Sequence, residues 1–333
     1  MKRKHRIKKK FLAKQARQNT AQQESRSEDS NKPKKESNSI YYKHYKALLI
    51  IPFVILLIAI VIIVVQTART GDFINKGIDL KGGVEITVPT HNLSPDIIKS
   101  QLIQAFPQKD FQVNKLENSG EEVAITANAN ILPDENETLT AFVSKLEEIT
   151  GVDKSAMDTN EIGAALGDAF FKQTMVAVLI AFVFMGLIVF LYFKSPAPSA
   201  AVILAAFSDI VITIAVVDLL GIKIGTGGIA ALLMLIGYSV DTDILLSTRV
   251  LRNKEGTVYH RVINAMKTGL TMTITTMAAV IVALILGESE ILREIMTIIL
   301  IGLFADVINT WIQNTGIIRW WKEKQDAKEA SSN

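Results

Sequence analysis

The hydrophobic residues of this chain fall into six long runs separated by polar segments. Each run has 18 to 24 residues, enough for an α-helix to cross a hydrocarbon core of about 30 Å. We therefore expect a polytopic α-helical membrane protein with six transmembrane helices. The predicted helices span residues 47–66, 174–193, 200–220, 224–246, 269–286 and 295–318.

A different pattern occupies the segment between the first two runs, residues 67–172. Short stretches that predict strands are interleaved with stretches of helical periodicity. Ser94 followed by Pro95 is typical of a helix start, with serine as N-cap and proline in the first turn. We expect one α+β domain of βαββαβ, ferredoxin-like topology. The predicted strands are 83–89, 111–116, 122–127 and 152–158, and the predicted helices are 94–106 and 135–149.

The charge distribution predicts how the chain is oriented. Residues 1–46 contain 15 Lys and Arg against 4 Asp and Glu, a net +11, whereas the remainder contains 21 against 29, a net −8. Basic residues also follow the fourth and sixth runs, so the positive-inside rule places both termini in the cytoplasm. The expected parts are a basic cytoplasmic tail (1–46), a first helix (47–66), an extracytoplasmic domain (67–172), a five-helix bundle (173–318) and a cytoplasmic tail (319–333).

The basic tail is polar and low in complexity, so we expect it to be disordered. Two interpretations of its charge stay open: a topology signal that contacts anionic lipid, or a contact to ribosomal RNA. The lipid interpretation is favoured, and no nucleic-acid partner is expected. Asn92 and Asn136 begin Asn-x-Ser/Thr sequences that are glycan acceptors in exported loops, although turn and cap roles account for them more simply.

Composition excludes several classes of chemistry. The 333 residues include no cysteine and only four histidines, so disulfides, thiolate catalysis and cysteine-ligated metal sites are excluded. The chain also lacks a phosphate-binding loop, a zinc-binding histidine pair and a serine-nucleophile motif. We therefore expect a protein that is not an enzyme and holds no cofactor or metal.

Polar residues inside the predicted helices are the candidate functional groups, because an Asp near a helix centre costs roughly 2.5 to 3.5 kcal/mol on insertion scales. Counting from the helix ends, Asp209, Asp241 and Asp306 can meet at one level, whereas Asp243 is 200° from Asp241 around its helix. The candidates for an ion relay or an intramembrane polar network are Asp209, Asp241, Asp243, Thr275, Asp306 and Asn309.

Two interpretations of these groups stay open. They can hydrogen-bond between helices and hold the bundle together. Alternatively, clustered carboxylates can take up and release protons or cations as the bundle changes shape. We favour the second interpretation for Asp241.

Three motifs carry a resemblance to a known family. Residues 77–83 read GIDLKGG, which resembles the G-[IL]-D-[LF]-x-G-G signature of the SecD/SecF protein-export membrane proteins, with Asp79, Gly82 and Gly83 as its matching positions. Residues 237–243 read GYSVDTD and are followed by Arg249, which resembles the fourth-span motif of the SecF branch, beginning at Gly237. Residues 273–276 resemble its fifth-span motif. In length and motif order the chain is similar to the archaeal type.

The chain also departs from these motifs. Asp241-Thr242-Asp243 stands where bacterial members have Asn-Asp-Thr, so its first acid matches an Asp of the SecD half better. Asp209 matches the Asp of a third-span His-Asp pair, but Ser208 replaces the His. The basic partner expected at the start of span five has only Lys267 as a near match.

The resemblance implies a function and partners that hydropathy does not. It implies membership in the resistance-nodulation-division superfamily, pairing with SecD, and an accessory role at a SecYEG-type channel while polypeptide is translocated. Our hypothesis adds that ion movement past Asp241 and its neighbours drives or biases the motion of the exported domain. An alternative is half of an efflux-type transporter for a lipid or small molecule, because the same superfamily architecture performs it. A third interpretation is a scaffold that stabilises SecD or the channel.

Overall fold

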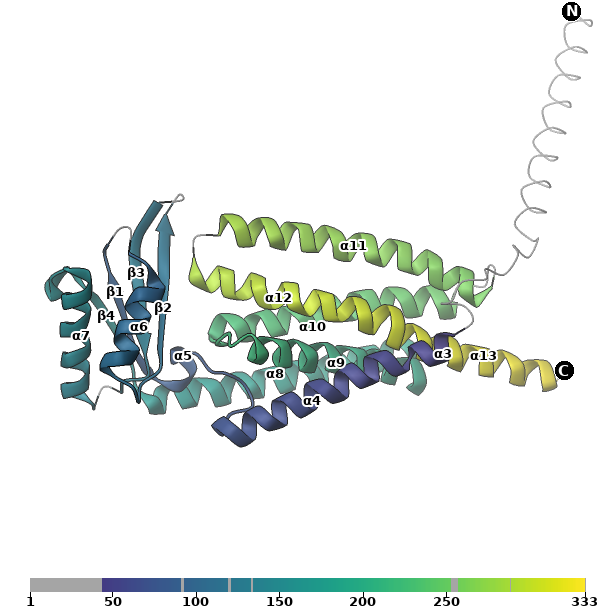
Figure 1. Ribbon diagram of the computed structural model, residues 1–333. Coiled ribbons are helices and arrows are strands. Elements are labelled where there is room, and N and C mark those ends of the chain that lie inside the picture. The colour runs from purple at the N-terminus through teal and green to yellow at the C-terminus, as the bar shows by residue number, and fades with distance from the viewer. Residues whose placement is uncertain are drawn as a thin grey trace, which may run out of the picture.

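The computed structural model describes residues 44–332 except 91–92, 119–120, 133, 253–256 and 288. A bundle of long helices carries a small α+β domain at one end, and both described ends of the chain lie at the other (Figure 1). These are called the domain end and the terminal end below. Most of the predicted basic tail and the predicted acceptor Asn92 lie outside the described residues.

Five helices are long and apolar enough to cross a membrane. They correspond to the first five predicted spans, so this part of the prediction is confirmed. Helices α3 and α4 together form the first, and α8 extends ten residues farther toward the domain than predicted. Their bounds are α3 Tyr45–Leu48, α4 Ile50–Thr70, α8 Ala164–Phe193, α9 Pro196–Leu219, α10 Thr226–Arg252 and α11 Val258–Leu286.

The predicted sixth span is helical but not uniformly α-helical. Helix α12 (Glu290–Ile308) passes into a π-helix, η2 (Asn309–Asn314), and then into α13 (Thr315–Ser332). The sequence gives no sign of this change, because a π-helix differs from an α-helix only in its i→i+5 hydrogen bonds. The π-helix lies at the depth of the polar residues described below.

The small domain has the predicted element order. Its four strands form an antiparallel sheet in the order β2-β3-β1-β4, with Ile86 of β1 opposite Ala127 of β3 and Thr159 of β4. Its elements are β1 Gly83–Val88, α6 Pro95–Ala105, β2 Phe111–Asn118, β3 Glu121–Ala129, α7 Asn136–Thr150, η1 Lys154–Ala156 and β4 Asp158–Ile162.

One local expectation for this domain is wrong, and another is confirmed in position only. The last strand begins at Asp158 and not at 152, because residues 154–156 form a 3₁₀ turn in which the Asp153 carboxylate accepts the Ser155 N–H. Ser94 occupies the N-cap position of α6 and Pro95 its first turn, as predicted, but the serine side chain makes no capping hydrogen bond.

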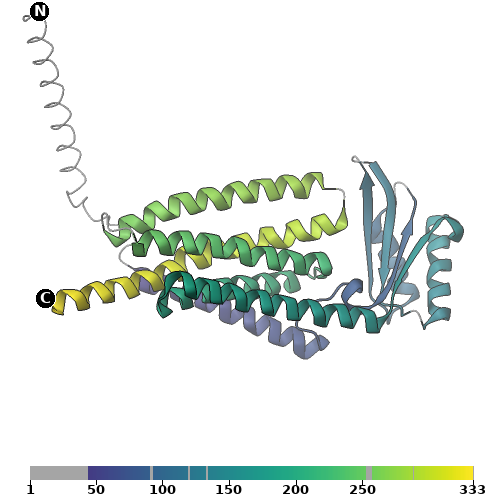
Figure 2. The same ribbon diagram turned by 180° about the vertical axis from the view of Figure 1, so that it is seen from behind.

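One face of the sheet forms the domain core. Alternate residues of β1, β2 and β3 pack under α6 and α7, with Phe111 and Phe142 in ring contact at 5.4 Å between centroids. Helix α7 lies on the side away from the bundle (Figures 1 and 2). The other face carries polar side chains, including Glu85, whose pKa is raised by burial and by the neighbouring charges of Asp79 and Asp158.

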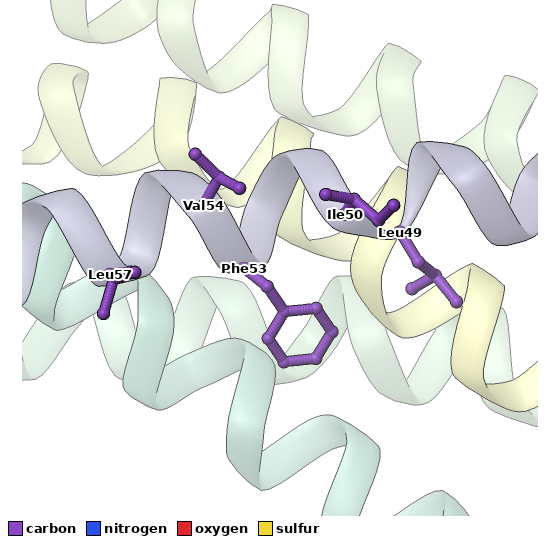
Figure 3. Close-up of a pocket in the computed structure, with 5 residues that line it drawn as sticks. All are labelled: Leu49, Ile50, Phe53, Val54 and Leu57. Atoms are coloured by element: carbon purple, nitrogen blue, oxygen red, sulfur yellow. The ribbon is translucent and has the colours of Figure 1, made fainter.

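The helices of the bundle differ in how much of their surface is covered. Helices α9 and α10 are the most enclosed, whereas α4 and α8 expose apolar side chains along most of their length. Four of those on α4, together with the preceding Leu49, line a shallow apolar groove (Figure 3): Leu49, Ile50, Phe53, Val54 and Leu57. Such a surface is typical of a helix that faces lipid.

Candidate functional site

Three carboxylates lie buried at the centre of the bundle. Asp209 on α9 and Asp243 on α10 are fully buried, and Asp306 on α12 is 1% exposed. Helices α9, α10 and α12 pack against one another along their lengths. The three acids and the hydroxyl and amide side chains bonded to them are called the acid cluster below.

Asp209 is fully paired. Its Oδ2 accepts the Ser239 hydroxyl at 2.5 Å, and its Oδ1 accepts the Asn309 amide at 2.7 Å. The donors come from α10 and the π-helix, so this carboxylate joins three parts of the bundle. Charge-assisted hydrogen bonds of this kind are about twice as strong as neutral ones.

Asp243 and Asp306 share a donor. The Thr310 hydroxyl lies 2.9 Å from Asp243 Oδ1 and 2.9 Å from Asp306 Oδ1. Asp243 Oδ1 also accepts the Asn314 amide at 2.6 Å, and Thr242 lies 3.3 Å from Asp306 Oδ1. These contacts bring the two carboxyl groups to the two sides of one hydroxyl.

The π-helix supplies most of the uncharged members of this cluster. Asn309, Thr310, Gln313 and Asn314 are all fully buried. Of the candidates named from the sequence, Asp306 lies on α12 and Asn309 on the π-helix, and both are buried. Thr310 and Asn314 were not named among the candidates, although on an α-helix they lie only about 40° and about 80° from Asp306.

The acid cluster has more acceptors than donors. Three of its buried oxygens have no hydrogen-bond partner among the described residues, Asp243 Oδ2, Asn309 Oδ1 and Asn314 Oδ1, and the neighbouring Gln313 Oε1 has none either. Over the same residues, no ion pair reaches any of its three acids, and no group of three acids or histidines is arranged to hold a metal ion. A site rich in oxygen and poor in hydrogen is chemically suited to take up a proton or a cation.

Asp241 does not join Asp209 and Asp306, so the expected meeting of these three acids is wrong. Asp241 is exposed on the opposite side of α10, beside Tyr238, which is 40% exposed. The predicted 200° separation from Asp243 therefore holds, but it is Asp243 that faces inward. A polar side chain left uncovered on a membrane helix is typical of a surface that meets another protein.

The other candidates on this side are also peripheral. Thr275 is exposed and donates to the Thr271 carbonyl of its own helix at 2.7 Å. Gly237 is exposed, with nothing within 4 Å of where a Cβ would stand. Arg249 donates to the Asn264 carbonyl at 3.2 Å and so joins α10 to α11 at the terminal end.

The GIDLKGG segment forms a joint at the domain end of the bundle. Asp79 lies on the short helix α5 (Ile78–Lys81), and its Oδ2 accepts the Thr226 N–H at the first residue of α10, at 2.5 Å. A carboxylate at a helix N-terminus pairs with N–H groups that lack partners inside the helix. Asp79 therefore caps the helix that carries Asp243.

Glycines let three segments meet at this joint. A Cβ on Gly82 would stand 2.7 Å from the Ala164 backbone at the start of α8, and one on Gly83 would stand 2.4 Å from the Ala129 carbonyl oxygen of β3. Both also have positive φ, 83° and 148°. The motif glycines thus allow α5 to turn directly into β1 while touching α8.

Further contacts tie the domain end together. Glu294 on α12 accepts the Gly225 N–H at 2.6 Å, and Asp218 on α9 accepts the Asn75 N–H at 2.9 Å. Lys223 forms an ion pair with Asp110 of the small domain at 2.8 Å. We define the joint as these contacts together with those of Asp79, and it connects the domain with α9, α10 and α12.

Comparison with known proteins identifies the family. Residues 142–324 match the family described as "Protein export membrane protein SecD/SecF, C-terminal". A protein-export membrane protein SecF of Methanocaldococcus jannaschii is 40% identical over 266 residues, covering 77% of this chain and 90% of that protein. A SecF of Pyrococcus furiosus is 38% identical over 265 residues, covering 78% of this chain and 85% of that protein.

Solved structures show the same fold. A crystal structure of SecDF, a translocon-associated membrane protein from Thermus thermophilus, matches 86% of this chain with a TM-score of 0.64 and 21% identity. A SecDF structure in a super-membrane-facing form matches 85% with a TM-score of 0.57. This chain covers 39% of each of those chains. Since the sequence matches extend over three quarters of its length, the chain belongs to the SecF branch of the SecD/SecF family of protein-export membrane proteins.

Proposed function

We propose that this chain is a non-enzymatic accessory subunit of the Sec protein-export machinery, in which it pairs with SecD and assists polypeptide translocation through a SecYEG-type channel. Family membership carries the export role. The SecDF chain from Thermus supports the pairing, because this chain matches only 39% of it and so leaves room there for a second half.

The face of α10 that exposes Asp241 is the surface we assign to SecD. Asp241, Tyr238 and Gly237 lie together on it, and α11 contributes the exposed Thr275. An Asp that faced lipid would be costly, whereas a partner helix can cover it. Gly237 lets such a helix approach closely.

The topology proposal follows the charge pattern. Segment 290–318, through α12, η2 and the start of α13, forms the sixth span, with both termini in the cytoplasm and the ferredoxin-like domain outside, where it meets translocating polypeptide. The position of both described ends at the end of the bundle opposite the domain supports an even number of crossings (Figure 2). The proposed domain limits remain 67–172 and 173–318, and the basic tail contacts anionic lipid.

The membrane part is proposed to couple export to the proton or cation gradient. The observation that supports this is the acid cluster, which buries three carboxylates without an ion-paired Lys, Arg or His among the described residues. In this proposal Asp241 belongs to the surface of α10 that we assign to SecD, and gradient coupling does not require protonation of Asp241.

A pull-down tests the pairing. The tagged chain is extracted from its native membrane in mild detergent, and co-purifying proteins are identified by mass spectrometry. We expect SecD and channel subunits. Gly237→Leu should abolish SecD recovery without altering the fold, because its side chain meets nothing inside the chain. Leu57→Trp, on the exposed face of α4, is the matched control and should retain SecD.

The same experiment addresses the alternatives. A homo-oligomer without SecD would favour the efflux-type transporter of a lipid or small molecule. If SecD is recovered but an export assay shows no dependence on the ion gradient, the scaffold interpretation would be favoured.

A further inference from the structure

The apolar groove on α4 belongs to a single stripe of the helix that begins at a lysine. Its lining residues, 49, 50, 53, 54 and 57, follow Lys46 at spacings of three or four residues. On a helix with 3.6 residues per turn, these side chains all lie within about 80° of Lys46 around the axis. Helices α3 and α4 join through Leu49, whose backbone is α-helical. The stripe therefore runs without a break from Lys46 into the groove.

The groove is open and entirely apolar. It has a volume of about 300 Å³, and each side chain that lines it is a hydrocarbon. Ile50 and Leu57 are each 61% exposed, and Phe53 is 42% exposed. Figure 3 shows the Phe53 ring extending away from α4. The described residues leave this surface uncovered, so in a membrane it contacts the apolar chains of lipids.

The length of the stripe matches one leaflet of a bilayer. Leu57 follows Lys46 by eleven residues, which is about 16 Å along an α-helix. Half of a hydrocarbon core is about 15 Å thick. A lipid whose headgroup lies at Lys46 therefore has an acyl chain that reaches the end of the groove at the middle of the bilayer.

The charge at the start of the stripe complements an anionic headgroup. Lys46 is exposed, and no acid among the described residues forms an ion pair with it. Glu323, the acid beside Tyr45, already accepts the Tyr45 hydroxyl at 2.6 Å and Arg319 Nε at 2.7 Å. Lys46 also ends the segment 1–46, whose sequence has a net charge of +11. Basic residues of this kind attract anionic lipid.

The surface that we assign to SecD lies elsewhere. That surface is on α10 and α11, and Figures 1 and 2 show α11 and α4 on opposite sides of the bundle. SecD bound to α10 and α11 therefore leaves the groove open to lipid.

We propose that Lys46 and the α4 groove form a binding site for one anionic phospholipid in the leaflet at the terminal end. The Lys46 ammonium donates to the lipid phosphate, and one acyl chain lies along Phe53, Val54 and Leu57. The inference rests on the proposed function, in which the basic tail contacts anionic lipid, and it gives that contact a residue and a place.

Native mass spectrometry of the purified full-length chain tests the site. The chain is incubated in detergent with equal amounts of phosphatidylglycerol and phosphatidylcholine, and each bound lipid is counted. We expect one phosphatidylglycerol to stay bound, with phosphatidylcholine held about fivefold less well, the factor that one basic residue contributes near an anionic surface. Equal retention of the two lipids would overturn the proposal.

Variants of the stripe locate the lipid. Lys46→Gln should remove the preference for phosphatidylglycerol, whereas Lys46→Arg should keep it. Val54→Trp fills the groove and should lower the binding of phosphatidylglycerol. Ile51→Trp is the matched control, because Ile51 is 45% exposed on the same helix but lies about 140° from Lys46. Binding that is unchanged in both Lys46→Gln and Val54→Trp would refute the site.

A variant that lacks residues 2–40 separates the groove from the tail. If this deletion removes the preference while Lys46→Gln and Val54→Trp keep it, the tail contact stands and the groove site is refuted. If the two point variants remove it and the deletion does not, the groove binds lipid without the tail.

The pull-down with SecD separates a lipid from a protein occupant. The point variants should all retain SecD and channel subunits, because the groove lies away from the assigned surface. If Val54→Trp loses either protein while its lipid binding is unchanged, a protein occupies the groove and the lipid proposal is wrong.

Discussion

The chain places carboxylates at two depths, half-buried at the joint and buried at the centre of the bundle, and it pairs them in two different ways. At the joint, Asp79, Glu294 and Asp218 each accept a backbone N–H, from Thr226, Gly225 and Asn75. At the centre of the bundle, Asp209, Asp243 and Asp306 accept only from hydroxyl and amide side chains. Within the residues that the structure describes, no ion pair reaches the three acids at the centre of the bundle.

The difference separates fixed acids from adaptable ones. A backbone N–H points where its helix or turn holds it, so an acid that it bonds marks a structural contact. A hydroxyl rotates freely and can donate or accept, so an acid that it bonds can gain or lose a proton without a change in the fold. We therefore expect the joint to keep the small domain fixed to α9, α10 and α12, and the acid cluster to gain or lose protons.

The largest expected effect is on Asp209. Asp209→Ala leaves the Ser239 hydroxyl and the Asn309 amide buried without their acceptor, and each unsatisfied group costs about 1 to 3 kcal/mol. We expect a loss of about 2 to 5 kcal/mol in SDS-induced unfolding of the chain in mixed micelles. Asp209→Asn, which keeps one acceptor oxygen, should lose less. Equal losses in both variants would contradict the role of the hydrogen bonds.

The next effect concerns the cap of α10. Asp79→Ala removes a charged acceptor from a helix N-terminus, which costs about 1 kcal/mol. Hydrogen exchange at the amides of 226–229 should become about fivefold faster, as that energy implies. Asp96→Ala removes an exposed acid of the same domain and is the control. Faster exchange in both variants would show a general effect of charge on the domain.

A smaller effect tests an acid that belongs to neither group. Burial, followed by the charges of Asp79 and Asp158, raises the pKa of Glu85 above its ordinary 4.5. The folded form therefore holds this proton more tightly, and the stability that it contributes is present below pH 4.5 and lost as pH rises through the raised pKa. Glu85→Gln should slow exchange of the β1 amides at pH 7 and leave it unchanged at pH 4. A difference that is larger at pH 4 would reverse the sign and refute the assignment.

The smallest expected effect is on Asp241, two residues from Asp243 on the same helix. Asp241→Asn should change the free energy of unfolding by less than about 0.5 kcal/mol, because the side chain is exposed within this chain. Asp243→Asn, measured in the same micelles, is the comparison and should lose more. Similar losses would mean that the two sides of α10 do not differ as described.

The apolar parts of the fold were predictable, since hydrophobic length and period-two alternation located five helices and three of the four strands. The starts of α8 and α11, which extend beyond the apolar runs, and the last strand were placed less well. The centre of the bundle was predictable only in part. Depth along the helix correctly placed Asp209 and Asp306 at one level, but the choice between Asp241 and Asp243 depends on how α10 is rotated. That rotation is set by packing against α9 and α12, which no local pattern contains. Thr310 lies about 40° from Asp306 on an α-helix, so the helical count was able to place it beside that acid, whereas its contact with Asp243 depends on the same rotation of α10.

The π-helix also has a consequence for chain length. A π turn holds one more residue than an α turn, so removing one residue from 309–314 would let a continuous α-helix join α12 to α13 without re-aiming α13. Tyr45 would still reach Glu323, its partner at 2.6 Å in the present fold, while the side chains around Thr310 would change face. The orientation of the side chains around Thr310 therefore depends on one additional residue in the π-helix as well as on the residue types.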